Sequence, residues 1–258
     1  MTSYTLITGS TSGIGKAFAR KMAQEKHNLI LVSRDEKKLA EQQAALSGEY
    51  GISVQTFAVD LAQPGAAGKV YAATSEQGLC VDILVNNAGF NECGAFLDTD
   101  IVAEVSMIQL HAVCTTELMK LYLPAMVKNG FGRVVNLGST GSYMACPNDS
   151  VYAATKAYIL QVSKGINAEL KGTGVTVTTL CPGSTKTAFA TKAGMEGAFL
   201  FKFFVMDPEK VADIGYRAMR RGRTSVIAGI YNKLLVFASK ITPPGILNPL
   251  TLKMLSRA

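Results

Sequence analysis

The stretch Leu6-Ile7-Thr8-Gly9-Ser10-Thr11-Ser12-Gly13-Ile14-Gly15 joins a short apolar run to a glycine-rich turn. The following residues predict a helix, because Ile14, Phe18 and Met22 recur every fourth residue and so share one face. Glycines let a backbone turn sharply and approach a pyrophosphate, whose charge is favoured by a helix N-terminus. Strand, turn and helix in this order predict the start of a dinucleotide-binding fold, although the G-x3-G-x-G spacing is not specific by itself.

Apolar runs alternate with helical patterns along the rest of the chain. The runs are continuous, which is typical of strands that are buried on both faces of a parallel sheet. We therefore expect an α/β fold of the doubly wound Rossmann type, a seven-stranded parallel sheet with helices on both faces. No repeat or linker interrupts the pattern, so residues 1–258 are expected to form a single domain. The expected strands contain Leu6-Ile7, Leu29–Val32, Val54–Val59, Ile83–Val85, Val134–Leu137, Val175–Leu180 and Val226-Ile227.

Two segments depart from this rhythm. Residues 188–206 contain the aromatic run Phe199-Leu200-Phe201-Lys202-Phe203-Phe204, which predicts a lid over a substrate. Packing of this run in the core, or against another subunit, is the alternative. Residues 229–258 follow the last expected strand and form a C-terminal extension that is rich in apolar residues.

The charge of the chain is unevenly distributed. The 258 residues carry a formal net charge of +7. The extension holds Lys233, Lys240, Lys253 and Arg257 and no Asp or Glu, so it contributes +4 of that total. A nucleic-acid-binding protein is expected to show a dense basic stripe, and we expect no nucleic acid as a partner. The basic, apolar extension leaves open a weak contact with a membrane surface.

The cysteines indicate a reducing compartment. They are odd in number and scattered, without the CxxC or Cys/His spacings that bind zinc, so neither a metal site nor a disulfide framework is expected. The first apolar run is too short for a signal peptide and no stretch has the length of a membrane span, so the expected location is cytoplasmic. The cysteines are Cys80, Cys93, Cys114, Cys146 and Cys181.

The end of the second expected strand indicates which dinucleotide is bound. An NAD site usually has a carboxylate at this point for the ribose 2′-hydroxyl, whereas a 2′-phosphate needs a cation. Here Ser33 is uncharged and Arg34 follows it, which favours NADP(H). The alternative is that Arg34 is a solvated residue at a helix start, with Asp35 as the N-cap.

A phenol and an ammonium group lie one helical turn apart in Tyr152-Ala153-Ala154-Thr155-Lys156. A free tyrosine titrates near ~10, and a nearby Lys together with a cationic oxidised nicotinamide is expected to lower that pKa. Such a phenol can donate a proton to a forming alkoxide, or accept one from an alcohol. Ser139, thirteen residues upstream, offers a hydroxyl to a substrate oxygen.

These motifs occur together in one order and at one spacing. The chain resembles the short-chain dehydrogenase/reductase family over nearly its whole length. The resemblance rests on Thr8–Gly15, Asp60, Asn86-Asn87-Ala88-Gly89, Ser139, Tyr152, Lys156 and Pro182–Thr187.

The resemblance implies a role for each matching residue. Tyr152 would be the general acid or base, Lys156 would lower its pKa and hold the nicotinamide ribose, and Ser139 would bind the substrate oxygen. Asp60 would contact the adenine amino group and Thr187 the nicotinamide carboxamide, unless they only cap helices. The implied NADP(H) site comprises Gly9, Ser10, Thr11, Ser12, Gly13, Ile14, Gly15, Ser33, Arg34, Asp60, Leu61, Asn87, Ala88, Gly89, Tyr152, Lys156, Pro182, Gly183, Thr185 and Thr187.

One position departs from the family. Its members usually have an Asn thirteen residues ahead of a Pro, where it positions a water that connects the Lys to solvent. Counting back from Pro124 reaches His111. We expect His111 either to hold that water or to act as a titratable relay with a pKa near neutral. The alternative is a packed histidine that takes no part in turnover.

The expected substrate is bulky and apolar. Met144 and Cys146 lie between Ser139 and Tyr152, and Phe199 and Phe203 lie in the expected lid. These residues offer few charges or hydrogen bonds, which favours a lipophilic ketone or secondary alcohol, such as a steroid or lipid.

Two other functions are compatible with parts of the sequence. A 3-oxoacyl-thioester reductase would need a basic patch for a carrier protein. A non-catalytic NADP(H)-binding sensor or scaffold is suggested by His111 but disfavoured by the joint presence of Ser139, Tyr152 and Lys156. The four arginines near residue 220 are alternatively explained as the solvated end of a helix. Candidates for the basic patch are Lys128, Arg133, Arg217, Arg220, Arg221 and Arg223.

The resemblance also implies a homodimer or homotetramer, built on the helices around residues 105–128 and 150–171. The C-terminal extension is expected to block further contacts of a tetramer, to cover the active site, or to rest on a membrane.

Overall fold

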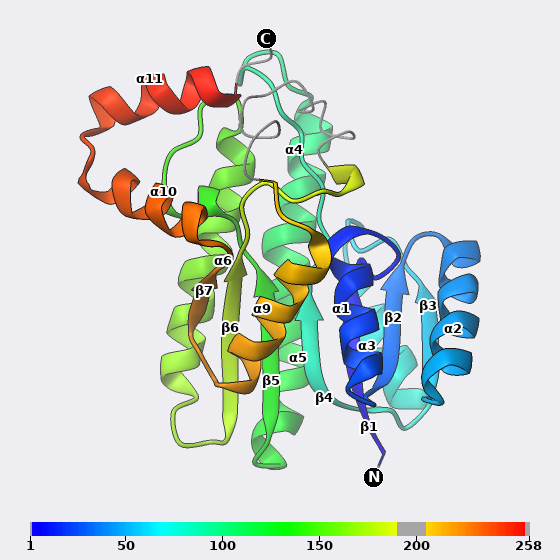
Figure 1. Ribbon diagram of the computed structural model, residues 1–258. Helices are drawn as coiled ribbons and strands as arrows, with labels where there is room; N and C mark the ends of the chain where they lie inside the picture. The colour runs from blue at the N-terminus through cyan, green and yellow to red at the C-terminus, as the bar shows by residue number, and fades with distance from the viewer. Residues whose placement is uncertain (1, 190–204, 256–258) are drawn as a thin grey trace.

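The computed structural model describes residues 2–189 and 205–255 and contains one seven-stranded sheet (Figure 1). All neighbouring strands pair in parallel, in the order β3-β2-β1-β4-β5-β6-β7. The predicted doubly wound Rossmann fold is thereby confirmed. The strands are β1 (Ser3–Thr8), β2 (Asn28–Ser33), β3 (Val54–Ala58), β4 (Cys80–Asn86), β5 (Gly132–Leu137), β6 (Val175–Cys181) and β7 (Ser225–Ile227).

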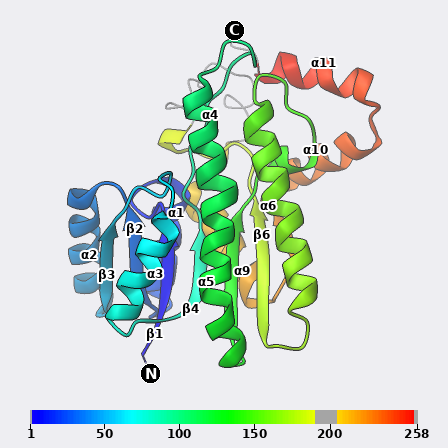
Figure 2. The ribbon, with the colours of Figure 1, turned by 180° about the vertical axis from the view of Figure 1, so that it is seen from behind.

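Helices cover both faces of the sheet (Figures 1 and 2). Two short helical segments differ from the rest: η1 (Gln109–Cys114) is a π-helix that joins α4 to α5, and η2 (Thr140–Tyr143) is a 3₁₀ turn. The α-helices are α1 (Gly13–Gln24), α2 (Glu36–Tyr50), α3 (Ala66–Glu76), α4 (Ile101–Ile108), α5 (Thr115–Lys128), α6 (Ser150–Glu169), α9 (Pro208–Arg220), α10 (Ile230–Ile241) and α11 (Pro244–Leu255).

The sheet has a hydrophobic core on each face, and neighbouring residues of one strand pack in different cores. Ile7 and Val135 pack under α1, α2 and α9, whereas their neighbours Leu6 and Val134 pack on the opposite face under α3, α5 and α6. All four side chains are fully buried. Side chains alternate between the faces of a strand, so both faces must be apolar when both are covered.

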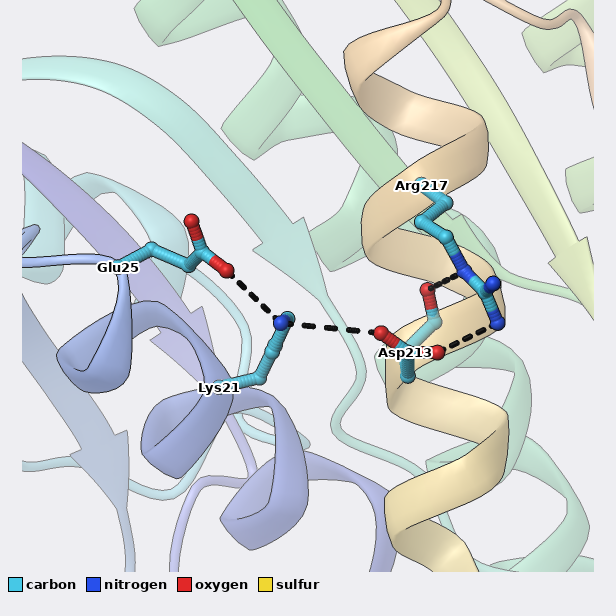
Figure 3. Close-up of polar contacts among 4 residues, drawn as sticks. All are labelled: Lys21, Glu25, Asp213 and Arg217. Carbon is cyan, nitrogen blue, oxygen red and sulfur yellow. Dashed lines mark hydrogen bonds and ion pairs between the residues drawn. The ribbon is translucent and has the colours of Figure 1, made fainter.

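Helices α1 and α9 pack closely over the first core. A Cβ on Gly215 of α9 would come within 2.6 Å of Phe18 Cζ and 2.7 Å of Leu180 Cδ2, so only glycine fits there. At the surface, Lys21 of α1 bridges Glu25 at 2.8 Å and Asp213 of α9 at 3.7 Å (Figure 3). Exposed ion pairs of this kind stabilise little, so the apolar contact holds the two helices together.

The strand order reverses between β1 and β4, and this reversal positions the site. In parallel sheets of this type, ligands bind beyond the carboxyl ends of the strands at such a switch point. Gly9, Asn87, Ser139 and Pro182 follow the carboxyl ends of β1, β4, β5 and β6, so they lie along one edge of the sheet, where the arrowheads point in Figure 1.

The C-terminal extension forms two helices, α10 and α11, which lie beyond the β7 side of the sheet (Figures 1 and 2). Within residues 2–189 and 205–255, no helix combines the length and the apolar character needed to cross a bilayer. The expected assembly into dimers or tetramers stays a prediction.

Candidate active site

The glycine turn is braced by the end of β4. Gly9 has φ +63° and Gly13 has φ +52°, a backbone region that favours glycine. Asn87 Nδ2 donates to the carbonyl oxygens of Thr8 and Gly9, at 2.9 and 3.1 Å. A Cβ on Gly15 would overlap both the Gly9 carbonyl and the Asn87 amide. Asn87, expected to line the cofactor cleft, therefore also holds the turn in shape.

The turn fits a dinucleotide phosphate. Ser12, at the N-cap of α1, is exposed and its side chain makes no capping bond, and no acidic residue lies in the first turn. The N-terminal amides of α1 are therefore left for an anion. Thr187 lies beside the turn, because a Cβ on Gly13 would come within 2.9 Å of its Cγ2. The segment after β6 and the turn after β1 thus meet at one place.

The end of β2 holds the residues expected to recognise a 2′-phosphate. Ser33 Oγ lies 2.9 Å from Thr11 Oγ1 of the turn, which links the two loops. Asp35 accepts from the Lys38 amide at 3.1 Å and pairs with Lys38 Nζ at 2.7 Å, so it is the N-cap of α2. Arg34 is exposed and forms no ion pair with the described part of the chain. Its guanidinium is available to a ligand.

The remaining cofactor residues have mainly structural contacts. Asp60 Oδ1 accepts from the Ala62 amide at 3.1 Å, so it caps the turn after β3 and not a helix. Thr185 Oγ1 donates to the Gly183 carbonyl at 3.0 Å, and the Pro182 carbonyl accepts from the Thr140 amide at 2.9 Å. Leu61 and Ser10 are buried, Ile14 and Ala88 are half-buried, and Gly89 is exposed.

Ser139, Tyr152 and Lys156 are brought together where β5 ends and α6 begins. Ser139 is the N-cap of η2, where its Oγ accepts from the Gly141 amide at 3.1 Å, and its hydroxyl interacts with the Tyr152 phenol. Lys156 is buried, and its Nζ donates to the Leu137 carbonyl at 3.0 Å and lies 5.5 Å from the Tyr152 ring centroid. Ser142 connects the two elements, since its Oγ accepts from the Ser139 amide at 3.0 Å and donates to the Lys156 carbonyl at 2.8 Å.

The protein itself favours a neutral phenol. Burial raises the pKa of Tyr152 above its usual value, and the carboxyl group of Asp149 adds to this, while the Ser139 hydrogen bond opposes it. Lys156 is not among the groups that set this direction, and the expectation that Lys156 and an oxidised nicotinamide together lower the pKa of Tyr152 stays a prediction for the protein with its dinucleotide bound. Burial also lowers the pKa of Lys156 to about 8, so its ammonium persists at neutral pH.

Sequence reasoning missed Asp149. The residue is buried, and burial raises the pKa of its carboxyl group to about 7, against a hydrogen bond from Asn91 that lowers it. Its backbone carbonyl accepts the first hydrogen bond of α6, from Ala153. Its place three residues before Tyr152 was a signal in the sequence, but its burial depends on the tertiary fold.

His111 is fixed by α6. Its Nδ1 lies 2.9 Å from Thr155 Oγ1, and that hydroxyl donates to the Tyr152 carbonyl at 2.7 Å. The hydroxyl proton is used there, so His111 Nδ1 must be the donor and Nε2 carries a lone pair. Burial, together with the charge of Lys156, holds the pKa of His111 well below its usual range. This direction argues against a relay with a pKa near neutral.

The Nε2 atom of His111 lies beside Gly89, one of the residues expected to bind the cofactor. A Cβ on Gly89 would come within 2.6 Å of His111 Nε2, and this buried nitrogen has no hydrogen-bond partner among the described residues. The Tyr152 ring lies edge-on to the imidazole, with centroids 5.9 Å apart. The π-helix η1 carries His111, and no periodicity in the sequence distinguished it from an α-helix.

Apolar groups lie around the phenol. Phe189, which was not among the expected substrate residues, has its ring centroid 5.8 Å from that of Tyr152. Met144 and Cys146 are half-buried, and a Cβ on Gly141 would come within 3.4 Å of Cys146 Sγ and 3.5 Å of Ser139 Oγ. Phe199 and Phe203 lie outside the described residues, as does most of the expected lid.

The chain is similar in sequence and in structure to known dehydrogenases and reductases. It is 31% identical over 231 residues to a 7β-hydroxysteroid dehydrogenase of Collinsella aerofaciens, covering 88% of this chain and 86% of the relative. It is 27% identical to the ketoacyl reductase HetN of Nostoc sp., covering 93% and 85%. A short-chain dehydrogenase from Sphingobium yanoikuyae, solved in complex with NADPH, superposes with a TM-score of 0.84 at 30% identity and covers 95% of both chains.

The family itself follows from a match over most of the chain. Residues 3–196 match the short chain dehydrogenase family. That range contains the glycine turn, Ser139, Tyr152 and Lys156, whose side chains the fold brings to one edge of the sheet. The family uses NAD(P)H to interconvert carbonyl and alcohol groups. This chain belongs to the short-chain dehydrogenase/reductase family and is an oxidoreductase acting on CH–OH and C=O groups.

Proposed function

We propose that this oxidoreductase uses NADP(H) to reduce a ketone of a bulky lipophilic substrate, or to oxidise the corresponding secondary alcohol. One observation carries the proposal: the Ser139 hydroxyl and the Tyr152 phenol interact beside the Lys156 ammonium, and the Phe189 ring centroid is 5.8 Å from that of Tyr152. A polar pair for one oxygen atom, next to apolar side chains, suits a carbonyl group on an apolar skeleton. The 7β-hydroxysteroid dehydrogenase relative acts on such a skeleton.

Ser139, Tyr152 and Lys156 have different roles in the proposed reduction. The dinucleotide, when bound, supplies the hydride to the carbonyl carbon. Ser139 holds the carbonyl oxygen by a hydrogen bond, and Tyr152 delivers its phenolic proton to that oxygen as charge develops on it. Lys156 keeps a positive charge next to the developing phenolate and holds the ribose. The carbon thus gains a hydride and the oxygen a proton, which yields the alcohol.

The protonation states favour reduction. The raised pKa of Tyr152 keeps the phenol protonated at neutral pH, as an acid requires. An alkoxide is much more basic than a phenolate, so the transfer remains favourable. Lys156, with a pKa of about 8, is charged over the same range and stabilises the phenolate that proton transfer leaves behind.

The basic residues that would dock a carrier protein, as the 3-oxoacyl-thioester alternative requires, do not lie beside the active site. A ketoacyl reductase is among the relatives, and this similarity supports the alternative. However, Arg133 is at the start of β5 and Lys128 at the end of α5, while Arg220 ends α9. These residues lie at the opposite edge of the sheet from Ser139 (Figure 1). Arg217 is also paired with Asp213 at 2.5 Å (Figure 3).

Substitution of Tyr152 separates an enzyme from a scaffold. We expect Tyr152→Phe to reduce turnover of lipophilic ketones by roughly 10²- to 10⁴-fold, because the proton donor is lost, while NADPH still binds. Consumption of NADPH is followed by absorbance against steroid ketones, aliphatic ketones and an acetoacetyl thioester. Tyr158→Phe is the matched control, since Tyr158 is an exposed tyrosine on the same helix. A wild-type protein that binds NADPH but reduces none of these compounds would support the scaffold reading.

Substitution of Arg34 tests the choice of dinucleotide. We expect Arg34→Glu to weaken NADPH binding by about tenfold or more, because a charge-assisted bond to the 2′-phosphate is replaced by repulsion. Binding of NADH, which lacks that phosphate, should change much less. Both affinities are measured by fluorescence titration, with Lys37→Glu as a control for a charge reversal on the same exposed helix start. Equal losses for both dinucleotides, or none, would contradict the NADP(H) assignment.

We further propose that His111 positions Tyr152 without titrating. His111→Leu removes the donor to Thr155, and we expect it to lower kcat by roughly tenfold. His111→Asn keeps a donor and should recover much of the rate. Because His111 stays neutral, neither variant should move the pH profile of kcat/KM between about pH 6 and 8. A displaced profile in His111→Asn would show that His111 does titrate.

A further inference from the structure

Helix α10 exposes an apolar stripe. Ile230, Leu234, Phe237 and Ile241 are spaced by four, three and four residues, which places them on one helical face, and they are 62%, 58%, 62% and 68% exposed. A surface helix usually turns such a face toward the core and leaves polar residues outside. Here the opposite face is the buried one, so the apolar stripe of α10 faces solvent. The buried residues are Asn232, Val236 and Ser239.

Helix α11 also exposes apolar side chains. Ile246 and Leu250 are one turn apart and are 63% and 52% exposed. Both helices lie outside the sheet and its covering helices (Figures 1 and 2). We call the exposed apolar side chains of the two helices the C-terminal apolar face, which comprises Ile230, Leu234, Phe237, Ile241, Ile246 and Leu250.

The charged residues of the segment that carries this face have one sign. Residues 229–258 contain four basic residues and no acidic residue. Lys233 of α10 and Lys253 of α11 are exposed. Two copies of the chain that met symmetrically through this face would bring these cations together without a carboxylate from the same segment between them. A surface of opposite charge would be attracted instead.

The face is firmly attached to the rest of the protein. Asn232 Nδ2 donates to the Ala228 carbonyl at 2.6 Å, and a Cβ on Gly183 would overlap the Asn232 side chain. Lys240 Nζ lies 5.6 Å from the ring centroid of Tyr143 in η2, which begins beside Ser139. Helix α10 is therefore fixed to the segments that bear the active site.

We propose that the C-terminal apolar face docks on a bilayer surface that contains anionic phospholipids. The apolar side chains enter the interface, and Lys233 and Lys253 contact the headgroups, as in helices that lie in the plane of a membrane. Neither helix is long enough to cross the bilayer. Binding here does not depend on the proposed reaction, because none of the six apolar residues belongs to the active site.

Cosedimentation with vesicles tests the proposal on the full chain. Vesicles of phosphatidylcholine alone are compared with vesicles in which about a third of the lipid is phosphatidylglycerol. We expect binding at least tenfold tighter to the anionic vesicles, and weaker binding as salt is added. Absence of binding to the anionic vesicles, or equal binding to both kinds, overturns the proposal.

Paired substitutions locate the surface. We expect Phe237→Ser with Ile241→Ser, and separately Lys233→Gln with Lys253→Gln, each to weaken vesicle binding at least fivefold. The control is Arg221→Gln with Arg223→Gln, which removes the same charge from exposed positions elsewhere and should leave binding unchanged. Circular dichroism and NADPH binding confirm that each variant is folded.

Two results of these variants would overturn the proposal. The first is wild-type vesicle binding by Phe237→Ser with Ile241→Ser. The second is a smaller particle mass of that variant in light scattering, together with no vesicle binding by the wild type. The latter would show that the face joins two copies of the chain.

Discussion

Burial of the Lys156 ammonium at the end of β5 is the constraint on which the site depends. A buried charge needs hydrogen-bond partners, and Lys156 Nζ finds one in the Leu137 carbonyl, while its backbone carbonyl receives the Ser142 hydroxyl. These bonds fix α6 against β5 and η2 and so determine where Tyr152 and Ser139 meet. The side-chain amide of Asn87, which follows β4, fixes the glycine turn after β1 in a similar way, by hydrogen bonds to two backbone carbonyls.

The electrostatics of the site follow from the same burial. Low solvent exposure disfavours every charged form, so the pKa of Tyr152 rises, that of Lys156 falls to about 8, and that of His111 falls far enough to keep it neutral. The protein groups therefore offer a neutral acid next to one cation. That combination suits the reduction of a carbonyl, in which negative charge appears on oxygen and must be met by a proton.

Much of this arrangement could be predicted from the sequence. Continuous apolar runs such as Leu29–Val32 identified strands, because burial on both faces leaves no alternation. The sequence spacing of Ser139, Tyr152 and Lys156 also predicted that their side chains lie together in the fold. The π-helix around His111 could not be predicted, since its apolar pattern is that of an α-helix. The direction of the Tyr152 pKa, the burial of Asp149 and the outward apolar face of α10 depend on tertiary packing, which local spacing does not record.

The central claim is that the protein presents Tyr152 as a protonated acid. It is tested most directly by NMR of protein labelled with ¹³C at the tyrosine ring carbon that bears the hydroxyl, in the absence of dinucleotide. The resonance missing from Tyr152→Phe identifies the residue, and its chemical shift is followed with pH. The account predicts that this resonance keeps the shift of a neutral phenol to at least about pH 10, the value at which a free tyrosine titrates. Ionisation with a midpoint near or below about pH 8 would contradict it.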